Sequence, residues 1–445
     1  MKESQAVKVI SGGTLVLPDR MVRGDLAIEN GIISKIGGHI SSKEEDRIDA
    51  MGQYILPGFI DIHHHGTYGF DFTFGAYDRP GDKFTSREKD FLEAMHASLA
   101  FTLSKGTTGL LLTTMAAPQS DILHSARMVR QYNDGGPCQD VILGINIEGS
   151  FLKLAAFAGA QNPAFFYPPS YAFIQELEQA SGGEIQIVNI PPEHGSAGIE
   201  LIEQLVRENM VVAGGHSGAY ADEFDQAIAS GLSLGVHFLN GPSLRSSKGL
   251  RGGGAEEAML KSDDISLEII ADGYHVDPSY VRDVLTRKGS DRVIVITDSM
   301  FATGLPDLKE FTICGLRGAV SSDHSYLRMP EKKDTLFGSV LTMDRAFGNI
   351  VRWLSSDITG AWHRHHGALA FEEAMLLATK LCSLNPAKLL GIYESTETKP
   401  GRGSIELGKR ADLLILQHSA NHPLPIIRDV LLGGVKARSI EPTWH

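Results

Sequence analysis

The chain has 445 residues, 42% of them hydrophobic, so it can bury a large core. One barrel of about 250 residues or more with a smaller appendage fits this length better than three equal domains. Its 41 Lys and Arg against 54 Asp and Glu give a net charge of −13. An acidic chain without basic blocks argues against nucleic acid or an anionic membrane as the principal partner.

The N-terminal sequence, MKESQAVKVISGG, has no apolar signal-peptide core, and the chain has no run of 18 uninterrupted apolar residues. We therefore expect a soluble cytoplasmic protein. The three cysteines, Cys138, Cys314 and Cys382, lack CxxC spacing. They indicate neither a disulfide framework nor a thiolate zinc site, so we interpret them as structural.

Both ends of the chain have a strand pattern. Residues 7–56 contain short apolar runs separated by turns, with Asn30-Gly31 as a hairpin signal, and residues 402–440 continue the pattern. Isolated hairpins are marginal in water, so we expect both ends to form one small β-sandwich domain. The predicted domains are residues 1–56 with 400–445, and residues 57–399.

Eight apolar runs occur between residues 55 and 298: ILPGFIDIH, TGLLLTT, VILGINIE, IQIVNI, VVAGGH, LSLGVHF, ISLEIIA and RVIVIT. Helix-like patterns lie between them, for example GIELIEQLVRENM, and EFDQAIASG with Gly231 as a helix stop. Strands that alternate with helices imply a parallel sheet. Eight such units predict an α/β fold, a (β/α)8 barrel of the TIM type.

Ionisable residues lie where these apolar runs end. They are His63, His65, Glu148, His216, His237 and Asp298. Such side chains are costly inside apolar strands unless they are paired or bind metal. Side chains alternate along a strand, so His63 and His65 share a face and His64 points away.

Imidazoles with a carboxylate suit Zn²⁺ or Fe²⁺ better than Mg²⁺ or Ca²⁺. The active site of such a barrel lies at the carboxyl ends of its strands. The pattern therefore predicts a metallohydrolase. A second group of histidines, His363, His365 and His366, lies in the polar segment SSDITGAWHRHHGALA, where we expect solvated loop residues.

The chain resembles the amidohydrolase superfamily and, within it, the N-acetylglucosamine-6-phosphate deacetylases. The resemblance covers nearly the whole length. It rests on LPGFIDIHHHG, the IEG that contains Glu148, GAQNP, GGHSGA, HFLNG, IADGYHVDP, VITDSM, GSVLTM, NPAKLLGI and GSIELGKRADL. Relatives such as hydantoinases carry a carboxylated lysine after strand 4, where this chain has VNIPPEHG without lysine.

The resemblance implies a metal site and a reaction. Glu148, His216 and His237 would form the core site, and His63 and His65 could hold a second ion, so one or two metals stay open. The implied reaction releases acetate from an acetamido sugar, most simply N-acetylglucosamine 6-phosphate. Asp298 would act as base and then as acid, because an amine anion leaves only when protonated.

The substrate residues follow the family with departures. Gln161 stands where the family has a histidine that polarises the acetyl carbonyl, and it can donate a hydrogen bond but cannot become cationic. Asn240, Gly241 and His275 would hold the sugar phosphate, with Asp272 in an orienting or structural role.

The phosphate-binding arginine that the family takes from a neighbouring subunit has no clear counterpart after Asn240-Gly241-Pro242. Arg245, Lys248 and Arg251 are the candidates, in a loop that could cross the interface of a homodimer. Two other interpretations stay open. One is deacylation of an N-acyl amino acid or a different acetamido sugar, and the other is a non-catalytic barrel that binds metal or sugar.

Overall fold

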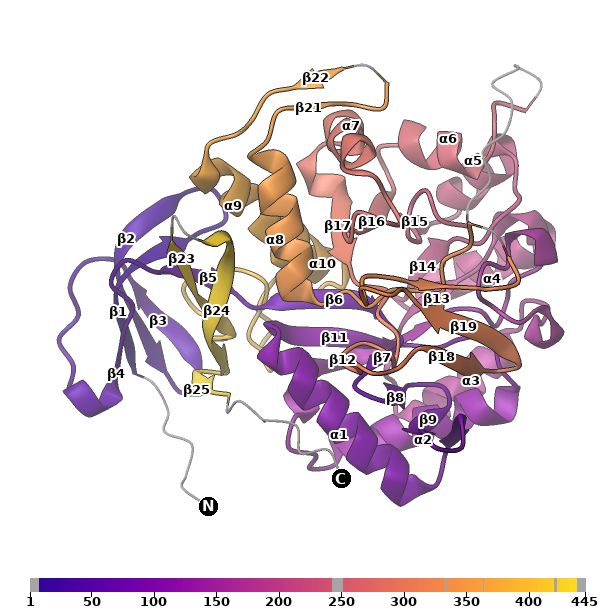
Figure 1. The fold of residues 1–445 in the computed structure, drawn as a ribbon, viewed down its shortest axis with the longest axis horizontal. Helices are drawn as coiled ribbons and strands as arrows, with labels where there is room; N and C mark the ends of the chain where they lie inside the picture. The colour runs from indigo at the N-terminus through magenta and orange to yellow at the C-terminus, as the bar shows by residue number, and fades with distance from the viewer. Residues whose placement is uncertain (1–7, 242–250, 333, 363, 420–421, 438–445) are drawn as a thin grey trace.

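The computed structural model describes residues 8–241, 251–332, 334–362, 364–419 and 422–437. In these residues the central sheet has eight parallel strands that neighbour one another in chain order (Figure 1). They are β6 (Phe59–His64), β11 (Thr107–Thr113), β12 (Ile142–Ile147), β13 (Ile185–Asn189), β14 (Val211–Gly214), β15 (Leu232–Gly235), β16 (Ser266–Ile270) and β17 (Val293–Ile296). Each lies within, or one residue beyond, a run expected from the sequence.

The sheet closes where its first and last strands meet. The backbone N–H of Asp298, just after β17, donates to the carbonyl oxygen of His63 in β6 over 2.9 Å. The N–H of His65 in turn donates to the carbonyl oxygen of Ser299 over 3.0 Å. These bonds join the carboxyl ends of β6 and β17, which confirms the predicted barrel.

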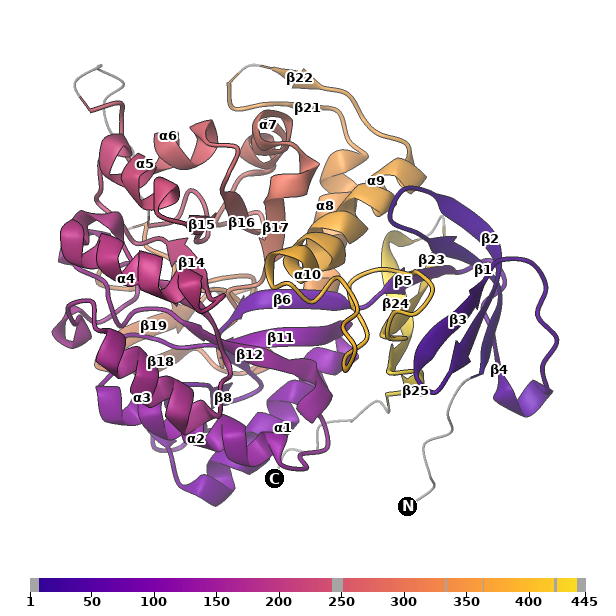
Figure 2. The same ribbon diagram turned by 180° about the vertical axis from the view of Figure 1, so that it is seen from behind.

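Helices cover the outside of the barrel (Figures 1 and 2). Those that follow successive barrel strands are α1 (Glu88–Ser104), α2 (Gln119–Asn133), α3 (Tyr171–Ser181), α4 (Ser196–Arg207), α5 (Ala221–Ala229), α6 (Ala255–Lys261), α7 (Pro278–Lys288) and α8 (Met343–Leu354). The chain continues through α9 (Phe371–Thr379), a π-helical turn (Lys380–Leu384) and α10 (Asn385–Leu389). Gly231, the expected helix stop, follows α5 with a φ of +110°.

Strands from both ends of the chain form a second sheet. They are β1 (Val9–Val16), β2 (Met21–Glu29), β3 (Ile32–Ile36), β4 (Arg47–Asp49), β5 (Tyr54–Pro57), β23 (Leu413–Ser419), β24 (His422–Leu432) and β25 (Val435–Lys436). Asn30 and Gly31 turn between β2 and β3 with φ values of +53° and +78°, as a tight hairpin requires. The predicted domain boundaries stay a prediction.

The first apolar run, ILPGFIDIH, is divided between two sheets, where the sequence suggested one strand. β5 pairs with β1 and β23 of the terminal sheet, whereas β6 begins after Gly58 and pairs with β11 of the barrel. A Cβ atom on Gly58 would lie 2.0 Å from Oγ1 of Thr108. Only glycine allows the chain to pass this close to the neighbouring strand.

Two insertions cover the mouth of the barrel. The first, after β6, contains β7 (Gly66–Thr67), β8 (Phe70–Asp71), β9 (Gly75–Asp78) and β10 (Lys83–Thr85). The second, after β17, contains β18 (Glu310–Ile313), β19 (Leu316–Val320) and β20 (Leu327–Arg328). Phe301, Phe311 and Phe337 form an apolar cluster with Met115 and Met300, which anchors the second insertion beside the strand ends.

The expectation of solvated histidines at residues 363–366 is wrong for His366. Its Nε2 donates to Oδ1 of Asp283 over 2.7 Å, and the residue is buried in a short hairpin of β21 (Ile358–Thr359) and β22 (His365–His366). The carboxylate from α7 provides the partner that burial demands. His365 is exposed, and His363 lies outside the described residues.

Among the helices of the described residues, none is both long and apolar enough to cross a membrane. Cys138, Cys314 and Cys382 are free thiols.

Candidate metal centre

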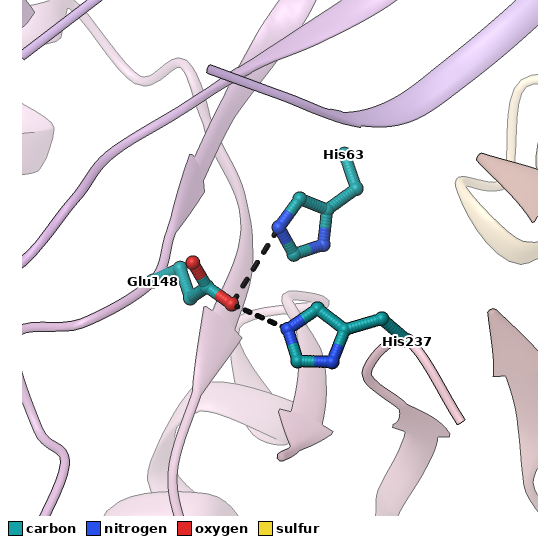
Figure 3. Close-up of side chains that lie close together, drawn as sticks. All are labelled: His63, Glu148 and His237. Atoms are coloured by element: carbon teal, nitrogen blue, oxygen red, sulfur yellow. Dashed lines mark hydrogen bonds and ion pairs between the residues drawn. The ribbon is translucent and has the colours of Figure 1, made fainter. Parts of the chain in front are cut away.

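Glu148 lies at the centre of the residues expected to bind metal. Its Oε1 is 3.1 Å from Nε2 of His237, 3.3 Å from Nε2 of His216 and 3.5 Å from Nε2 of His63. Its Oε2 is 3.5 Å from Nε2 of His65. Figure 3 shows His63 and His237 directed at this carboxylate from different segments of the chain. The structure thus brings together all five expected ligands, and each is buried.

Asp298 completes the cluster from the end of β17. Its Oδ1 lies 3.1 Å from Nε2 of His65 and 3.6 Å from Nε2 of His63. Burial alone would raise the pKa of Asp298, but the close approach of His65 and the other nearby imidazoles hold that pKa below its ordinary value. Asp298 is therefore ionised at neutral pH and can accept a proton.

Three of these residues have left-handed backbone conformations. The φ values are +49° for His216, +24° for His237 and +51° for Asp298. Such values are uncommon for residues with a Cβ and recur at functional sites, where the surrounding fold imposes them. Here the chain turns sharply as it leaves each strand, and the turn points the side chain into the barrel mouth.

Each imidazole of the cluster is held in place by a hydrogen bond from Nδ1, the ring nitrogen that does not face the cluster. Nδ1 of His63 donates to Glu268 Oε2 (3.0 Å), Nδ1 of His65 to Thr113 O (3.2 Å), Nδ1 of His216 to Phe157 O (2.8 Å) and Nδ1 of His237 to Asn240 O (2.5 Å). With the proton on Nδ1, the lone pair of every Nε2 points at the cluster. This is the tautomer that a metal ligand requires.

These lone pairs face other acceptors. Nε2 of His216 and Nε2 of His237 lie 3.1 Å apart, beside Oε1 of Glu148. Nε2 of His63 is buried without a hydrogen-bond partner. Acceptors gathered this closely repel one another unless a cation lies among them. Without a metal ion, a proton on His63 meets the same demand for positive charge: burial lowers the pKa of His63, but Glu268 and Glu148 raise it well above its ordinary range.

The donor set fits a divalent metal. In the described part of the chain, two groups have ligand atoms that all lie within 4.8 Å of one another: His63 with Glu148 and His237, and His63 with His65 and Asp298. Imidazole nitrogens with carboxylate oxygens suit zinc or iron. The chemistry of this site therefore matches the metal type expected from the sequence.

Glu268 is a site residue that the sequence interpretation missed. It is fully buried on β16, where its Oε2 also accepts a hydrogen bond from the backbone N–H of His237 over 3.0 Å. One carboxylate oxygen thus holds a residue of β6 and a residue that follows β15. The sequence did contain an indication of this role, because Glu268 is the ionisable residue inside the apolar run ISLEIIA.

A cavity of about 580 Å³ opens above the cluster. The expected substrate residues Gln161, Asn240, Gly241 and His275 line it, together with the metal-site residues His65, Glu148, His216, His237 and Asp298. The sequence did not indicate that Tyr274, Lys332 and residues 334–338 line it too. A Cβ on Gly241 would lie 2.9 Å from Nδ1 of His216, so this wall requires glycine.

Gln161 is held at both ends of its amide. Nε2 donates to Oε2 of Glu148 over 2.7 Å, and Oε1 accepts from the backbone N–H of Ala116 over 2.7 Å. The amide nitrogen has a second hydrogen, and Gln161 lines the cavity. Gln161 can therefore orient Glu148 and donate to a ligand at the same time.

His275 is paired with a carboxylate below the cavity wall. Its Nδ1 donates to Oδ2 of Asp272 over 2.7 Å. Burial would lower the pKa of His275, but this bond and the negative charge of Asp272 raise it. The imidazole is therefore biased toward the cationic form that would attract an anion.

Of the three expected phosphate-binding residues, the structure describes Arg251. Arg245 and Lys248 lie outside the described residues. The guanidinium of Arg251 bonds Asp222 at 3.0 Å, lies 3.3 Å from Glu223 and stacks 4.0 Å above the ring of Tyr220. Arg251 is not among the described residues that line the cavity.

Comparisons with known proteins agree with this site. Residues 54–436 match the Amidohydrolase family. An N-acetylglucosamine-6-phosphate deacetylase of Bacillus subtilis is 30% identical over 90% of this chain and 92% of its own. The N-acetylglucosamine-6-phosphate deacetylase of Lysinibacillus sphaericus is 31% identical over 73% of this chain and 78% of its own. An N-acetylgalactosamine-6-phosphate deacetylase of Escherichia coli O157:H7 is 30% identical over 88% of this chain and 90% of its own.

The fold has similar solved structures. A mutant N-acetyl-D-glucosamine-6-phosphate deacetylase from Mycobacterium smegmatis, in complex with N-acetyl-D-glucosamine-6-phosphate, aligns with a TM-score of 0.78 and 26% identity, over 97% of this chain and 99% of its own. The likeness in fold therefore extends over nearly the whole chain.

Proposed function

This chain belongs to the amidohydrolase family, and we propose that it hydrolyses the N-acetyl group of N-acetylglucosamine 6-phosphate to give acetate and the amino sugar phosphate. The observation that carries the proposal is the convergence of four imidazoles, Glu148 and Asp298 beneath one cavity. It is a hydrolytic enzyme that acts on an amide bond.

The ligands are proposed to be His63, His65, Glu148, His216 and His237, and the metal to be zinc, with one or two ions bound. A divalent metal held there supplies a Lewis acid and lowers the pKa of a water molecule to about 7, so that water can attack a carbonyl near neutral pH. Glu268, Thr113, Phe157 and Asn240 keep the imidazole Nε2 atoms directed at the cluster.

Asp298 moves the proton. Its carboxylate, kept ionised by the neighbouring imidazoles, accepts a proton from the attacking water at Oδ1 or Oδ2. It then delivers that proton to the amide nitrogen as the C–N bond breaks. The second amide hydrogen of Gln161 donates to the acetyl oxygen as negative charge develops on it.

The sugar lies against the cavity wall formed by Asn240, Gly241 and His275. The raised pKa of His275 favours its cationic form and hence an anionic substrate. A different acetamido sugar is the second candidate, because the N-acetylgalactosamine-6-phosphate deacetylase is also 30% identical. The homodimer and the cytoplasmic location expected from the sequence stay predictions.

The test is acetate release from a panel of N-acetylglucosamine, N-acetylgalactosamine, their 6-phosphates and an N-acetyl amino acid. We expect the highest kcat/KM with N-acetylglucosamine 6-phosphate, and no release after chelation. The Asp298→Asn variant, run beside the wild type, excludes a contaminating hydrolase. Equal or higher kcat/KM with the amino acid derivative would overturn the sugar assignment. If no compound released acetate, the remaining interpretation would be a non-catalytic barrel that binds metal or sugar.

A further inference from the structure

Beside the imidazole of His275, the described lining of the cavity offers little positive charge for an anionic substrate. Its lining includes the carboxylates of Glu148, Asp298 and Asp334. Of the described residues that line it, Lys332 is the one lysine or arginine. We propose that Lys332 binds the anionic group of the substrate, which is the 6-phosphate if the proposed function is correct.

Lys332 comes from the second insertion, which the chain adds between β17 and α8. Its backbone is fixed in a turn after β20, where its N–H donates to Met329 O over 3.2 Å and its carbonyl oxygen accepts from the N–H of Thr335 over 3.2 Å. Thr335 itself lines the cavity. This turn places Lys332 at the cavity, and Lys332 is part of the cavity lining.

The ammonium group lies next to a proposed metal ligand. Nζ of Lys332 donates to the carbonyl oxygen of Gly159 over 2.9 Å. A Cβ on Gly159 would approach Cε1 of His216 to 3.0 Å, so Gly159 lies beside the ring of His216. One residue thus separates Nζ from the ring of a ligand, which places the positive charge at the wall of the cavity above the cluster.

The chemistry of this group suits a phosphate. A lysine ammonium has three donors, and the bond to Gly159 occupies one of them. The other two can bond phosphate oxygens, and the flexible stem lets Nζ shift toward the anion. Lys332 is exposed, so the ion pair is accessible to solvent and salt should weaken it.

Arg251 does not compete for this role. Asp222 and Glu223 already pair with its guanidinium, and Tyr220 covers one face of it. Bonding a phosphate there would require those contacts to break. Lys332 needs to give up only a carbonyl partner, which water can replace.

The experiment compares Lys332→Met and Lys332→Arg with Lys309→Met. Lys309 is an exposed lysine at the start of the same insertion and is not among the described lining residues, so its loss controls for net charge. We expect Lys332→Met to raise KM for N-acetylglucosamine 6-phosphate about 10–100-fold, the usual effect of losing a charged hydrogen bond. The kcat should change little, and kcat/KM for unphosphorylated N-acetylglucosamine should stay within about twofold.

Lys332→Arg should recover most of the affinity, and Lys309→Met should resemble the wild type. Equal losses for both sugars would overturn the proposal, because they would mean that Lys332 acts only by holding Gly159 in place. Unchanged KM for the phosphorylated sugar would also overturn it, and Arg245 or Lys248 would then have to supply the charge.

A binding measurement separates this inference from the proposed function. Calorimetry with glucosamine 6-phosphate and with glucosamine requires no turnover. Selective loss of glucosamine 6-phosphate binding in Lys332→Met supports the anion site even if the wild type releases no acetate. If the wild type and Lys332→Met bind glucosamine 6-phosphate equally, the anion site is overturned, whether or not the protein is a deacetylase.

Discussion

Oε2 of Glu268 lies 3.0 Å from Nδ1 of His63, and the two residues stand on β16 and β6, the seventh and the first strands of the barrel. The same oxygen accepts the backbone N–H of His237 over 3.0 Å. This buried carboxylate holds the ring of one proposed ligand, His63, and the backbone of another, His237, so it couples the geometry of the two. It also makes Nε2 of His63 more basic toward a metal.

Glu268→Gln should weaken metal binding about 10–100-fold, the usual cost of losing a group that orients a ligand. The amide cannot stabilise a proton on Nδ1 as a carboxylate does. Competition with a chelator measures the affinity, and far-ultraviolet circular dichroism checks the fold. Glu178→Gln, a change in a partly buried carboxylate of α3, is the control. Wild-type affinity in Glu268→Gln would restrict Glu268 to packing.

His216→Ala and His237→Ala should each lose bound metal while keeping the barrel. Their Nε2 atoms lie 3.3 and 3.1 Å from Oε1 of Glu148, and different strands hold them. The loss of affinity should exceed that of Glu268→Gln, because a direct ligand is removed. Metal analysis of purified variants tests this, with exposed His365→Ala as the control. Full occupancy in either variant would remove that residue from the ligand set.

Asp298→Asn should lower kcat about 10²–10⁴-fold while substantially retaining metal, since an amide cannot shuttle the proton. The neighbouring imidazoles lower the pKa of Asp298, so the wild-type carboxylate accepts protons throughout the neutral range. Single-turnover acetate release separates this chemical step from product release. Near-native rates would assign proton transfer to another group.

Gln161→Ala should lower kcat and kcat/KM together by about 10²–10³-fold, as expected when a donor to a developing oxyanion is lost. It should also loosen Glu148, whose Oε2 loses the 2.7 Å hydrogen bond from Nε2. Measuring metal affinity beside kcat distinguishes the two effects. Gln161→His restores a donor and should recover part of the rate. An alanine variant with unchanged kinetics would place Gln161 outside the reaction.

Asp71→Asn should stabilise the protein stripped of metal increasingly from about pH 4 to about pH 6, and fully above that. Burial raises the pKa of Asp71 to about 6, although the positive charge of His65 and two backbone N–H groups oppose the shift. Its Oδ2 is buried without a hydrogen-bond partner. The folded state therefore binds the proton more tightly than the unfolded state, and ionisation costs stability as pH rises from about 4 to 6.

Removing that charge should raise the free energy of unfolding by up to about 3 kcal/mol at pH 7, from about 1.4 kcal/mol per pKa unit, and by little at pH 4. Thermal unfolding of both proteins at the two pH values measures the difference. An equal effect at both would mean that Asp71 is not charged in the folded protein at neutral pH.

The order of the barrel and the convergence of its six polar residues could be predicted from the chain alone. Apolar runs separated by amphipathic segments require parallel strands, and parallel strands place their carboxyl ends at one mouth. His63, Glu148, His237 and Asp298 had to meet once each followed a strand of that barrel. Alternation along β6 explains why His63 and His65, two residues apart, serve the same site.

Tertiary packing decided the rest. Nothing near Glu268 in the sequence shows that its carboxylate faces His63, 205 positions away. Lys332 reaches the cavity because an insertion after β17 folds back over the mouth, and His366 is buried because α7 presents Asp283 to it. Local periodicity determines which face of an element is apolar. Which polar side chain meets another depends on contacts between distant segments, and these exist only once the barrel has closed.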